Sequence, residues 1–510
     1  MTLDHSVAPP ARPADTATTT AAPATPSAAG SRRTGRWIED WRPEDPDFWA
    51  STGRPVARRN LVWSIFAEHL GFSVWLIWSV SAALLVASGF DFSAQQLFVL
   101  VAAPNLVGAL IRLPYSFAVA RFGGRNWTVT SALLLLVPTL LFVWAVQDPT
   151  TPYWAFLLIA ATAGLGGGNF ASSMANINFF YPTAEKGAAL GLNAAGGNLG
   201  VAVIQLLLPV LVGGAGLFGL VQASDGGLHL ERAGWLYAAL AVVAAVAAYA
   251  AMDNLAVASS RPREQLGVVV RPQTWLVSFL YVGSFGSFIG YSAAMPLLIK
   301  LNFFVPTPDG AGAGVNFAYY AFLGALVGSF TRPFGGWLAD RLGGARVTLA
   351  SFGGLVLGTL VVLWTLTRLA PNPEQSVAVA EANAAWFPLF LGAFLFVFAA
   401  TGIGNGAVFR MVPVIWRHRA EQGTAAGSAE RTAALAAATK ECSAALGVIG
   451  AVGALGGFGI PMMFGAPWID DPVSAVETAF VVFTAYYLVC AAVTYAVYAR
   501  RSSVLGQAGV

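Results

Sequence analysis

Long apolar runs separated by short polar turns make up most of the chain from about residue 60 to residue 500. Each run has at least the roughly 20 residues that an α-helix needs to cross the hydrocarbon core of a bilayer. In the first half of the chain the runs cover residues 61–89, 94–120, 126–147, 153–181, 187–213 and 233–256. In the second half they cover residues 273–300, 316–340, 346–369, 384–415, 431–462 and 473–499. The pattern predicts an all-α membrane protein of about twelve transmembrane helices in two six-helix halves.

The composition agrees with this prediction and excludes a soluble protein. Hydrophobic residues make up 56% of the chain and charged residues only 10%, whereas charged residues are about 25% of a typical globular domain. The two cysteines, Cys442 and Cys490, both lie in apolar runs, and the four histidines are scattered. Neither residue type has the spacing of a metal site or of a disulfide framework. We therefore expect no metal and no other cofactor.

The chain before the first run has a different character. Residues Ala8–Gly30 are rich in Ala, Pro, Thr and Ser, which predicts disorder. No early apolar stretch is present, which argues against a cleavable secretory signal. Tryptophans and acidic residues follow at Trp37–Pro46, and we expect these to lie on the surface before the first helix.

These features divide the chain into five parts. The predicted parts are a disordered or surface segment at 1–58, a six-helix bundle at 59–256, a linker at 257–272, a second six-helix bundle at 273–500 and a short tail at 501–510.

The charges of the loops predict the orientation in the membrane. With a cytoplasmic N-terminus, the basic residues of the loops on that side are Arg54, Arg58, Arg59, Arg121, Arg125, Lys186, Arg261, Arg263, Arg271, Arg341, Arg346, Arg417, Arg419, Arg500 and Arg501. The acidic residues of the opposite loops are Asp91, Asp148, Asp225, Glu231, Asp309, Glu374, Asp470 and Asp471. An excess of Lys and Arg marks cytoplasmic loops. We therefore expect a multi-pass protein of the inner (plasma) membrane with both termini, and the linker, in the cytoplasm.

Two short segments at equivalent places in the two halves resemble each other. Gly108–Tyr115 contains Arg112 and leads to Arg-Phe-Gly-Gly, while Gly328–Gly335 contains Arg332 and leads to Arg-Leu-Gly-Gly. In both halves nine residues separate the inner arginine from the loop arginine. Nine residues of helix span about 13.5 Å, which puts both inner arginines near the middle of the membrane. Two repeated halves that meet at a central site are a common plan of transporters.

A charge at mid-membrane costs about 3 kcal/mol or more, so each inner arginine needs an explanation. One explanation is a distant carboxylate or contact with an interface. The candidates are Glu68, expected near the cytoplasmic end because it lies only about two turns from Arg59, and Glu441, expected to pair with Lys440. The arginines then look under-compensated, and their repeat symmetry favours the other explanation, a bound anion. A planar guanidinium group suits a planar oxyanion because it donates paired hydrogen bonds.

The loop after Arg332 resembles the loop signature of the major facilitator superfamily. The matching residues are Gly336-Trp-Leu-Ala-Asp340-Arg341-Leu-Gly343, with Arg346 after them. The resemblance implies the major facilitator fold, in which this sequence joins the eighth and ninth helices. It also implies that Asp340 and Arg341 make charge contacts at cytoplasmic helix ends that bias one state of a gate. The first-half copy, Ala118–Arg125, lacks the aspartate.

Three segments rich in Gly and Asn lie inside predicted helices. They are Gly164–Pro182 with Asn169, Gly187–Gly200 with Asn193, and Gly402–Pro413 with Asn405. A membrane-buried asparagine needs hydrogen-bond partners, so these three are explained as well by contacts between helices as by a site. The phrase Gly-Gly-Asn-Phe-Ala-Ser-Ser-Met-Ala-Asn and the segment after it closely resemble the signatures of the nitrate/nitrite porter (NarK) family. The resemblance covers about Arg59 to Arg500.

This resemblance implies a substrate and a site. Arg112 and Arg332 would clasp nitrate or nitrite from opposite halves, and Asn198 and Tyr281 would donate further hydrogen bonds. The walls and supports would be Phe72, Phe170, Phe285 and Gly167, with Asn169, Asn193 and Asn405 as further candidates. Packing is the competing explanation for each phenylalanine. The chain has a longer loop at Pro306–Gly314 than some relatives, which we expect to be external and to leave the site unaltered.

The predicted function is secondary transport of nitrate and nitrite by alternating access. Two arginines facing each other in an empty site repel by about 2 kcal/mol at about 8 Å and an effective dielectric of 20, which favours exchange of nitrate for nitrite. The alternatives are proton-coupled nitrate symport through Glu68 or the Lys440–Glu441 pair, transport of another small anion, and an anion sensor. A drug–proton antiporter would be expected to have membrane acids instead of paired arginines.

The expected partners follow from this function. They are nitrate, nitrite and the lipid bilayer, with no nucleic acid, and a monomer suffices for the fold. No nucleophile, metal cluster or acid pair is visible in the core, so we do not expect an enzyme.

Overall fold

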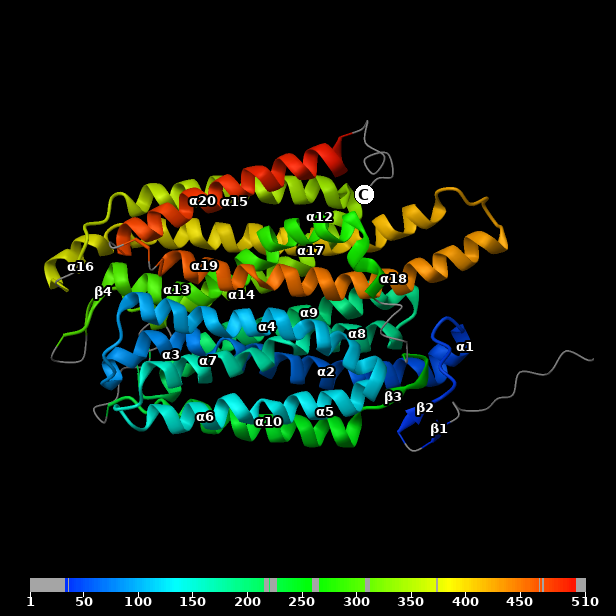
Figure 1. Cartoon of the computed structure of the whole chain (residues 1–510), viewed down its shortest axis with the longest axis horizontal. Helices are drawn as coiled ribbons and strands as arrows, with labels where there is room; N and C mark the ends of the chain where they lie inside the picture. The colour runs from blue at the N-terminus through cyan, green and yellow to red at the C-terminus, as the bar shows by residue number, and fades with distance from the viewer. Residues whose placement is uncertain are drawn as a thin grey trace, which may run out of the picture.

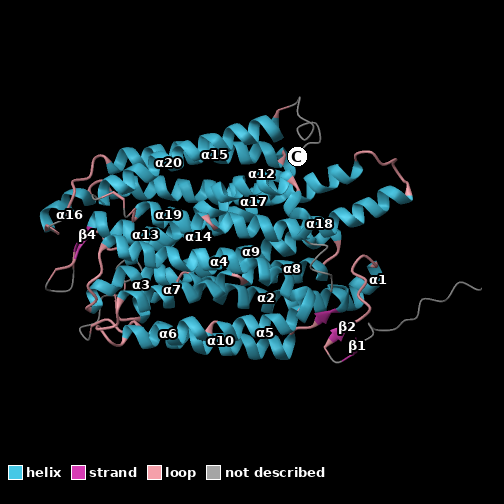
Figure 2. Ribbon diagram, in the orientation of Figure 1, coloured by secondary structure: helices cyan, strands magenta, loops and turns pink. Residues whose placement is uncertain are grey.

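The structure is a computed structural model that describes residues 33–34, 36–214, 220, 227–258, 266–307, 312–372, 375–466, 468–469 and 472–500. Long helices run side by side along the longest axis of the molecule, and short strands lie at their ends (Figure 1, Figure 2). The predicted disordered stretch Ala8–Gly30 and the tail 501–510 lie outside the described residues. So do parts of the predicted linker 257–272 and of the loop Pro306–Gly314.

Six helical spans follow one another in the described part of the first half. The first comprises α1 (Pro46–Phe48), the π-helical η1 (Trp49–Gly53), α2 (Arg54–Trp75), α3 (Ile77–Leu85) and η2 (Val86–Ser88). The next three are α4 (Ala94–Phe122), α5 with α6 (Gly124–Leu134, Leu136–Val146), and α7 with α8 (Tyr153–Gly167, Asn169–Phe180). The last two are α9 (Thr183–Leu211) and α10 (Glu231–Ala251).

The described part of the second half repeats this plan. Its first span comprises α12 (Pro272–Tyr281), the π-helical η6 (Val282–Gly286) and α13 (Ser287–Phe303), preceded by η5 (Leu266–Val270). The next three are α14 (Ala321–Leu342), α15 (Gly344–Leu366) and α17 (Phe387–Glu421), with the short α16 (Val377–Ala384) before α17. The last two are α18 with α19 (Ala429–Ala454, Gly456–Phe464) and α20 with η8 (Pro472–Val493, Thr494–Ala499).

Eleven of the described spans are long and apolar enough to cross a membrane. The twelfth is α14, which has 22 residues but carries Arg332, Asp340 and Arg341 and is therefore less apolar. The prediction of an all-α membrane protein with about twelve helices is confirmed.

The first span begins at Pro46, well before the start predicted at residue 61. Asp45 caps this end, because its side chain accepts hydrogen bonds from the backbone N–H groups of Asp47 and Phe48, and Pro46 occupies the first turn. The additional turns are polar, and Arg59 pairs there with Asp253 after α10. Hydropathy detects only the apolar part of a helix. The polar turns before residue 61 could therefore not be predicted from it.

The segment before the first helix is tied to the ends of the first-half helices. Strand β2 (Trp37–Ile38) pairs antiparallel with β1 (Arg33–Thr34) and parallel with β3 (Asn254–Leu255), which follows α10. Trp41 Nε1 donates to the Phe179 carbonyl (3.1 Å), and at the start of the first span Trp49 Nε1 donates to the Glu185 carboxylate (3.0 Å). The tryptophans of this segment are therefore anchors on α8 and α9.

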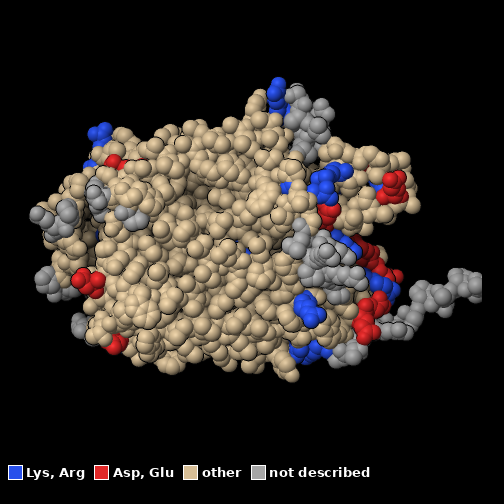
Figure 3. Space-filling model, in the orientation of Figure 1, with Lys and Arg blue, Asp and Glu red and all other residues tan. Residues whose placement is uncertain are grey.

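Charged side chains gather at the two ends of the molecule, and the wide zone between them shows almost none on the face in Figure 3. Large apolar side chains of the helices, such as Trp144 of α6, Leu158 of α7 and Val246 of α10, are exposed, as expected of a surface that faces lipid. The chain is a multi-pass membrane protein. We name the end that carries Arg54 and Arg341 the basic end and the opposite one the acidic end; both ends of the described chain lie at the basic end (Figure 1).

Hydrogen bonds join the two halves toward the acidic end. Lys300 Nζ of α13 donates to the Ala83 carbonyl of α3 (2.7 Å). Gln205 Nε2 of α9 donates to the Ser292 carbonyl of α13 (2.6 Å), and α4 packs against α19 on the same side. These contacts close the interface between the halves at the acidic end.

Candidate functional site

Arg112 of α4 is fully buried and connects the two halves of the molecule. Its Nε donates to the Gly167 carbonyl of α7 (3.0 Å), and its Nη1 donates to the Gly450 carbonyl of α18 (2.9 Å). Gly167 belongs to the first half and Gly450 to the second. One guanidinium group therefore bridges the interface at the level where the sequence predicts a central site.

Arg332 of α14 occupies the matching place in the second half and is only 5% exposed. Its Nη2 donates to the hydroxyl of Tyr281 at the end of α12 over 3.4 Å. Its guanidinium carbon lies 5.6 Å from the ring centre of Phe409 in α17. The structure thus brings Arg332 and Tyr281 together, as the resemblance implied.

Two phenylalanine rings lie close to both arginines. The Arg112 guanidinium carbon lies 4.8 Å from the ring centre of Phe170 and 4.9 Å from that of Phe285. The Arg332 carbon lies 5.3 Å and 5.9 Å from the same two centres. The rings stack on each other with centres 5.9 Å apart, one from α8 and one from η6. Both positive groups therefore share the same aromatic faces, where cation–π attraction stabilises each of them.

Each arginine retains a donor nitrogen without a hydrogen-bond partner in the described part of the chain. These atoms are Nη2 of Arg112 and Nη1 of Arg332. A buried donor left unpaired costs about 1–3 kcal/mol. Two guanidinium forks from opposite halves, each with an unused donor, have the chemistry to hold a small planar oxyanion.

Asn198 and Asn405 are also buried with unused hydrogen-bonding capacity. Both amide atoms of each side chain lack a partner among the described residues. The structure does not bring either of them into hydrogen-bond contact with Arg112 or Arg332 in that part of the chain. Both side chains therefore have unused hydrogen-bonding capacity within the described residues, and the role of Asn198 at the site stays a prediction.

The other two candidate asparagines make contacts between helices. Asn169 Nδ2 donates to the Ala67 carbonyl of α2 over 3.4 Å. Asn193 Nδ2 donates to the Glu68 carboxylate over 2.6 Å. For Asn169 and Asn193, the observed contacts are the contacts between helices that the sequence analysis gave as the alternative to a role in the site.

Gly167 and Phe72 pack against residues that contact Arg112, namely Trp75 and Phe170. A Cβ on Gly167 would lie 2.8 Å from Trp75 Cε2 and 2.9 Å from Gly108 Cα, so only glycine fits between α4 and the Trp75 ring. Phe72 is fully buried and meets Phe170 edge to face with ring centres 6.1 Å apart.

The expectation that Glu68 lies near the cytoplasmic end was wrong. Its side chain is 1% exposed and lies within electrostatic range of both Arg332 and Arg112. The early start of the first helix explains the error, because Arg59 is already inside that helix and Glu68 lies nine residues deeper. A buried carboxyl group therefore lies near the two arginines, which the sequence did not indicate.

The expected pair of Glu441 with Lys440 was also wrong. Glu441 of α18 pairs with Arg271 at the start of α12 (3.0 Å). Consecutive residues on a helix do not face each other, so a partner from another element is the better placed one.

The two charged residues of the loop signature, Asp340 and Arg341, make their contacts within the second half. Asp340 at the end of α14 pairs with Arg410 of α17, and the Arg341 guanidinium lies 4.1 Å from the ring centre of Trp337 on its own helix. The Asp340 contact therefore holds two helices of one half together and does not cross to the other half.

Sequence reasoning missed three features of the site. Trp75 lies under the Arg112 guanidinium at 5.1 Å, Phe409 lies beside Arg332, and Gly450 accepts from Arg112 through its backbone. Phe409 sits inside the Gly402–Pro413 motif and was detectable there. A backbone carbonyl leaves no trace in the residue type.

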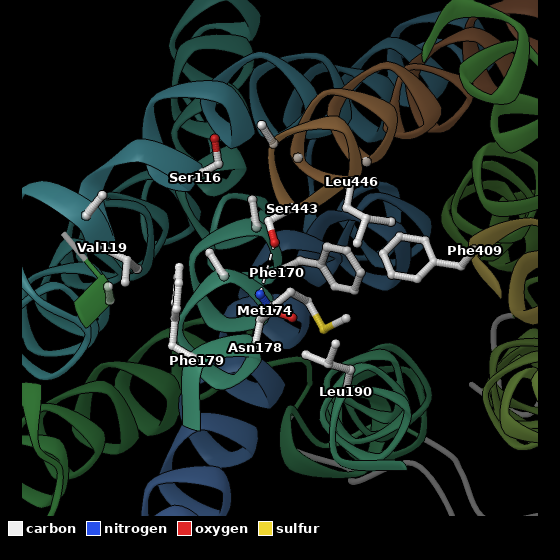
Figure 4. Close-up of a pocket in the computed structure, with 17 residues that line it drawn as sticks. Ser116, Val119, Phe170, Met174, Asn178, Phe179, Leu190, Phe409, Ser443 and Leu446 are labelled. Atoms are coloured by element: carbon white, nitrogen blue, oxygen red, sulfur yellow. Dashed lines mark hydrogen bonds between the residues drawn. The ribbon is translucent and has the colours of Figure 1, made fainter. Parts of the chain in front are cut away.

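A cleft lies on the basic side of the arginine pair, and neither arginine is among its lining residues. It lies between α4, α8, α9, α17 and α18, with Phe170, Phe409 and Gly450 at its inner limit. Figure 4 shows its wall, including the hydrogen bond from Asn178 Nδ2 of α8 to Ser443 Oγ of α18 (3.0 Å). The cleft ends at Phe170, Phe409 and Gly450, which contact the arginines, and the Asn178–Ser443 hydrogen bond joins the two halves across it.

Comparison with known proteins shows the family to which the chain belongs. Residues 69–439 match the family model described as the Major Facilitator Superfamily. The chain is 40% identical over 471 residues to the nitrate/nitrite transporter NarU of Salmonella typhimurium, covering 91% of this chain and 96% of that protein. It is 36% identical to the probable nitrate/nitrite antiporter NarK2 of Thermus thermophilus, covering 76% and 85%.

Solved structures agree on the fold. A bacterial homologue of the human lysosomal transporter Spinster, in an inward-facing conformation, has a TM-score of 0.54 at 14% identity and covers 89% of this chain and 98% of that one. A D-xylose–proton symporter has a TM-score of 0.53 at 15% identity and covers 86% and 96%.

Proposed function

Because the chain belongs to the major facilitator superfamily and, within it, to the nitrate/nitrite porter (NarK) family, we propose that it transports nitrate and nitrite by alternating access, exchanging one for the other. The observation that carries this proposal is the pair of buried arginines, Arg112 and Arg332. They come from opposite halves, share two aromatic faces and each keep an unused donor within the described structure.

We propose that the anion binds between the two guanidinium groups. Nitrate and nitrite are planar and carry one negative charge, so each fork donates in the plane of the anion. Tyr281 and Asn198 add donors, and the Phe170 and Phe285 rings exclude water and strengthen these interactions by lowering the local dielectric.

Charge balance is the reason for exchange. An anion between the arginines offsets their mutual repulsion, and the cleft at the basic end then closes as the halves rock about the site. An empty site faces a repulsion of about 2 kcal/mol at about 8 Å and an effective dielectric of 20, which slows its return. A second anion that binds between the arginines on the inner side and moves outward offsets this repulsion during the return step.

The setting of the proposed transport follows from the charges at the ends. We propose that the basic end, with both termini, faces the cytoplasm and that the protein lies in the inner membrane; the excess of arginines at that end supports this orientation by the positive-inside rule. One chain holds both arginines, so a monomer is sufficient. We assign it neither an enzymatic activity nor a nucleic-acid partner.

One observation favours a second mode of coupling. The buried carboxyl of Glu68 lies within electrostatic range of both arginines, and a carboxyl in that position is a candidate proton carrier.

The test of anion exchange uses the purified protein in liposomes. Uptake of isotope-labelled nitrate is measured with nitrite, nitrate, chloride or no permeant anion inside. We expect internal nitrite and internal nitrate to accelerate uptake and chloride to leave it at the level of the anion-free liposomes. Equal acceleration by chloride, or no uptake in any of the four, would contradict the proposal.

A further inference from the structure

A positively charged side chain joins the two halves at the acidic end. Lys300 lies in the last turn of α13, and its Nζ donates to the carbonyl of Ala83 in the last turn of α3 over 2.7 Å. The C-terminal ends of helices are favourable places for a cation, because the helix dipole is negative there. No carboxylate pairs with Lys300 in the described part of the chain. Its charge is therefore stabilised by helix ends and not by an opposite charge.

A second contact between the halves lies between Lys300 and the arginine pair. Gln205 Nε2 of α9 donates to the Ser292 carbonyl of α13 (2.6 Å) and lies 3.2 Å from Ser79 Oγ of α3. Along the same span, Ser292 follows Phe285 of the site and precedes Lys300 by eight residues, a rise of about 12 Å. The same three helices thus meet at two levels on the acidic side of the site.

Negative side chains stand near this closed interface. Asp91 and Asp148 are exposed in the loops at the acidic end, and Asp91 comes shortly after α3. Figure 3 shows further acidic groups there. A negative surface repels an approaching anion, so a cation at the interface of the halves would have an effect on anion entry that is larger than its single charge suggests.

We propose that Lys300 attracts the anion on the outer path: when the acidic end opens, its ammonium group leaves the Ala83 carbonyl and draws nitrate or nitrite toward Arg112 and Arg332. This inference rests on the proposed function, in which the interface closed here opens as the cleft at the basic end closes. Alternating access turns the contacting faces of α3, α9 and α13 into walls of the outer path. The groups that now join the halves then face the anion.

The chemistry of lysine suits attraction better than tight binding. An ammonium group is a compact, strongly hydrated point charge on a flexible stem, whereas Arg112 and Arg332 present rigid forks. Charges that line an entrance raise association rates by about tenfold or more, and salt weakens this effect. We therefore expect Lys300 to control the rate of exchange at low external nitrate and to matter little at saturation.

The test replaces the lysine by a cysteine and then changes the charge at that position chemically. Right-side-out membrane vesicles loaded with nitrite carry Lys300→Cys, and exchange is measured at nitrate concentrations below and above KM. A methanethiosulfonate with a quaternary ammonium group restores the positive charge but has no N–H, so it cannot rebuild the hydrogen bond to Ala83. We expect exchange at low nitrate to fall about tenfold in the variant and this reagent to restore most of it.

Reagents of other charge separate attraction from packing. The sulfonate and methyl reagents add a negative and a neutral group, and neither should restore exchange at low nitrate. The native cysteines, Cys442 and Cys490, are buried, so the unmutated protein should not respond to any of the three. Equal restoration by the methyl and the cationic reagent would overturn the inference, as would normal exchange by untreated Lys300→Cys at low nitrate.

The matched control is Arg368→Cys. Arg368 follows α15 at the same end of the molecule and is exposed beside Trp364 of its own half. Its loss removes one positive charge from the acidic end but none from the interface between the halves, so exchange at low nitrate should stay normal. An equal slowing in Arg368→Cys and Lys300→Cys would show an effect of surface charge in general and overturn the role of Lys300.

A second measurement needs no variant, and so covers the case in which Lys300→Cys does not fold. The chain has three lysines, of which Lys186 and Lys440 lie toward the basic end. A membrane-impermeant acylating reagent outside the vesicles should therefore neutralise Lys300 during exchange and slow exchange at low nitrate about tenfold. Peptide mass analysis identifies the acylated residue. A Lys300 that stays unmodified throughout exchange, or full exchange after its acylation, would overturn the inference.

Saturating nitrate separates this inference from the proposed function. If the unmutated protein does not exchange nitrate for nitrite at any concentration, the proposed function fails. Normal exchange that is insensitive to the charge at position 300 removes only the role of Lys300.

Discussion

Gly167 shows how tightly single residues are constrained around Arg112. Its carbonyl accepts from Arg112 Nε, and an added Cβ would lie 2.8 Å from the Trp75 ring. We predict that Gly167→Ala lowers the free energy of unfolding by about 1–3 kcal/mol, as expected of an overpacked core, and slows nitrate exchange. Thermal unfolding in detergent measures the first effect and counterflow in liposomes the second.

Gly187 provides the matched control, because a Cβ there would meet no atom within 4 Å. Gly187→Ala should leave stability unchanged or raise it by up to about 1 kcal/mol through helix propensity. If Gly167→Ala unfolds at the same temperature as Gly187→Ala, the close packing described here is not a constraint.

At this scale the sequence predicts charges better than contacts. Arg112 and Arg332 were predicted to be buried because a charge that recurs at equivalent places in apolar runs is visible in one dimension. The burial of Glu68 was not predicted, since it depends on how far α2 extends beyond the apolar run. The role of Gly450 was invisible because Arg112 meets its backbone and not a side chain.

At the scale of elements, the pair between Asp340 of α14 and Arg410 of α17 links two helices of one half. Both side chains are about half exposed, so the pair should contribute less than about 1 kcal/mol to stability. We predict that Asp340→Asn changes the rate of nitrate exchange, as a bias on the gate requires, and leaves nitrate affinity unchanged. The control is Glu421→Gln, which removes a partly exposed carboxylate that pairs with Arg417 along the same helix and with Arg431 of α18.

Affinity is measured by nitrate binding in detergent and the rate by counterflow. A large loss of affinity in Asp340→Asn would show that the residue acts on the site, and an unchanged rate would remove its gate role.

The spans themselves were predictable, and their irregularities were not. Apolar length determines where a helix crosses the membrane, so eleven described spans and α14 were found from hydropathy. The polar turns of α2 lie outside that signal. The π-helical η6, which carries Phe285 against Tyr281 with ring centres 5.2 Å apart, arises from packing between helices and has no signature in the run of residues.

At the scale of the whole molecule, the two halves differ in how they meet at the two ends. Lys300 and Gln205 join them toward the acidic end, while on the basic side a cleft lies between them that ends at Phe170 and Phe409 and is crossed by the Asn178–Ser443 hydrogen bond. The repeat in the sequence predicted two halves with a site between them, but not which end is open. One sequence encodes both states of a transporter, and their free energies differ by only a few kcal/mol.

The central claim is that one arginine from each half holds the anion through its planar fork. The most direct test is nitrate/nitrite counterflow in liposomes for Arg112→Lys and Arg332→Lys, each of which keeps the charge and removes the fork. Arg417→Lys, at an exposed position, is the control. We predict that each inner substitution lowers exchange by about 10-fold to 100-fold, as expected for loss of a charged hydrogen bond, while the control exchanges normally. Full exchange by either Arg112→Lys or Arg332→Lys would contradict the account.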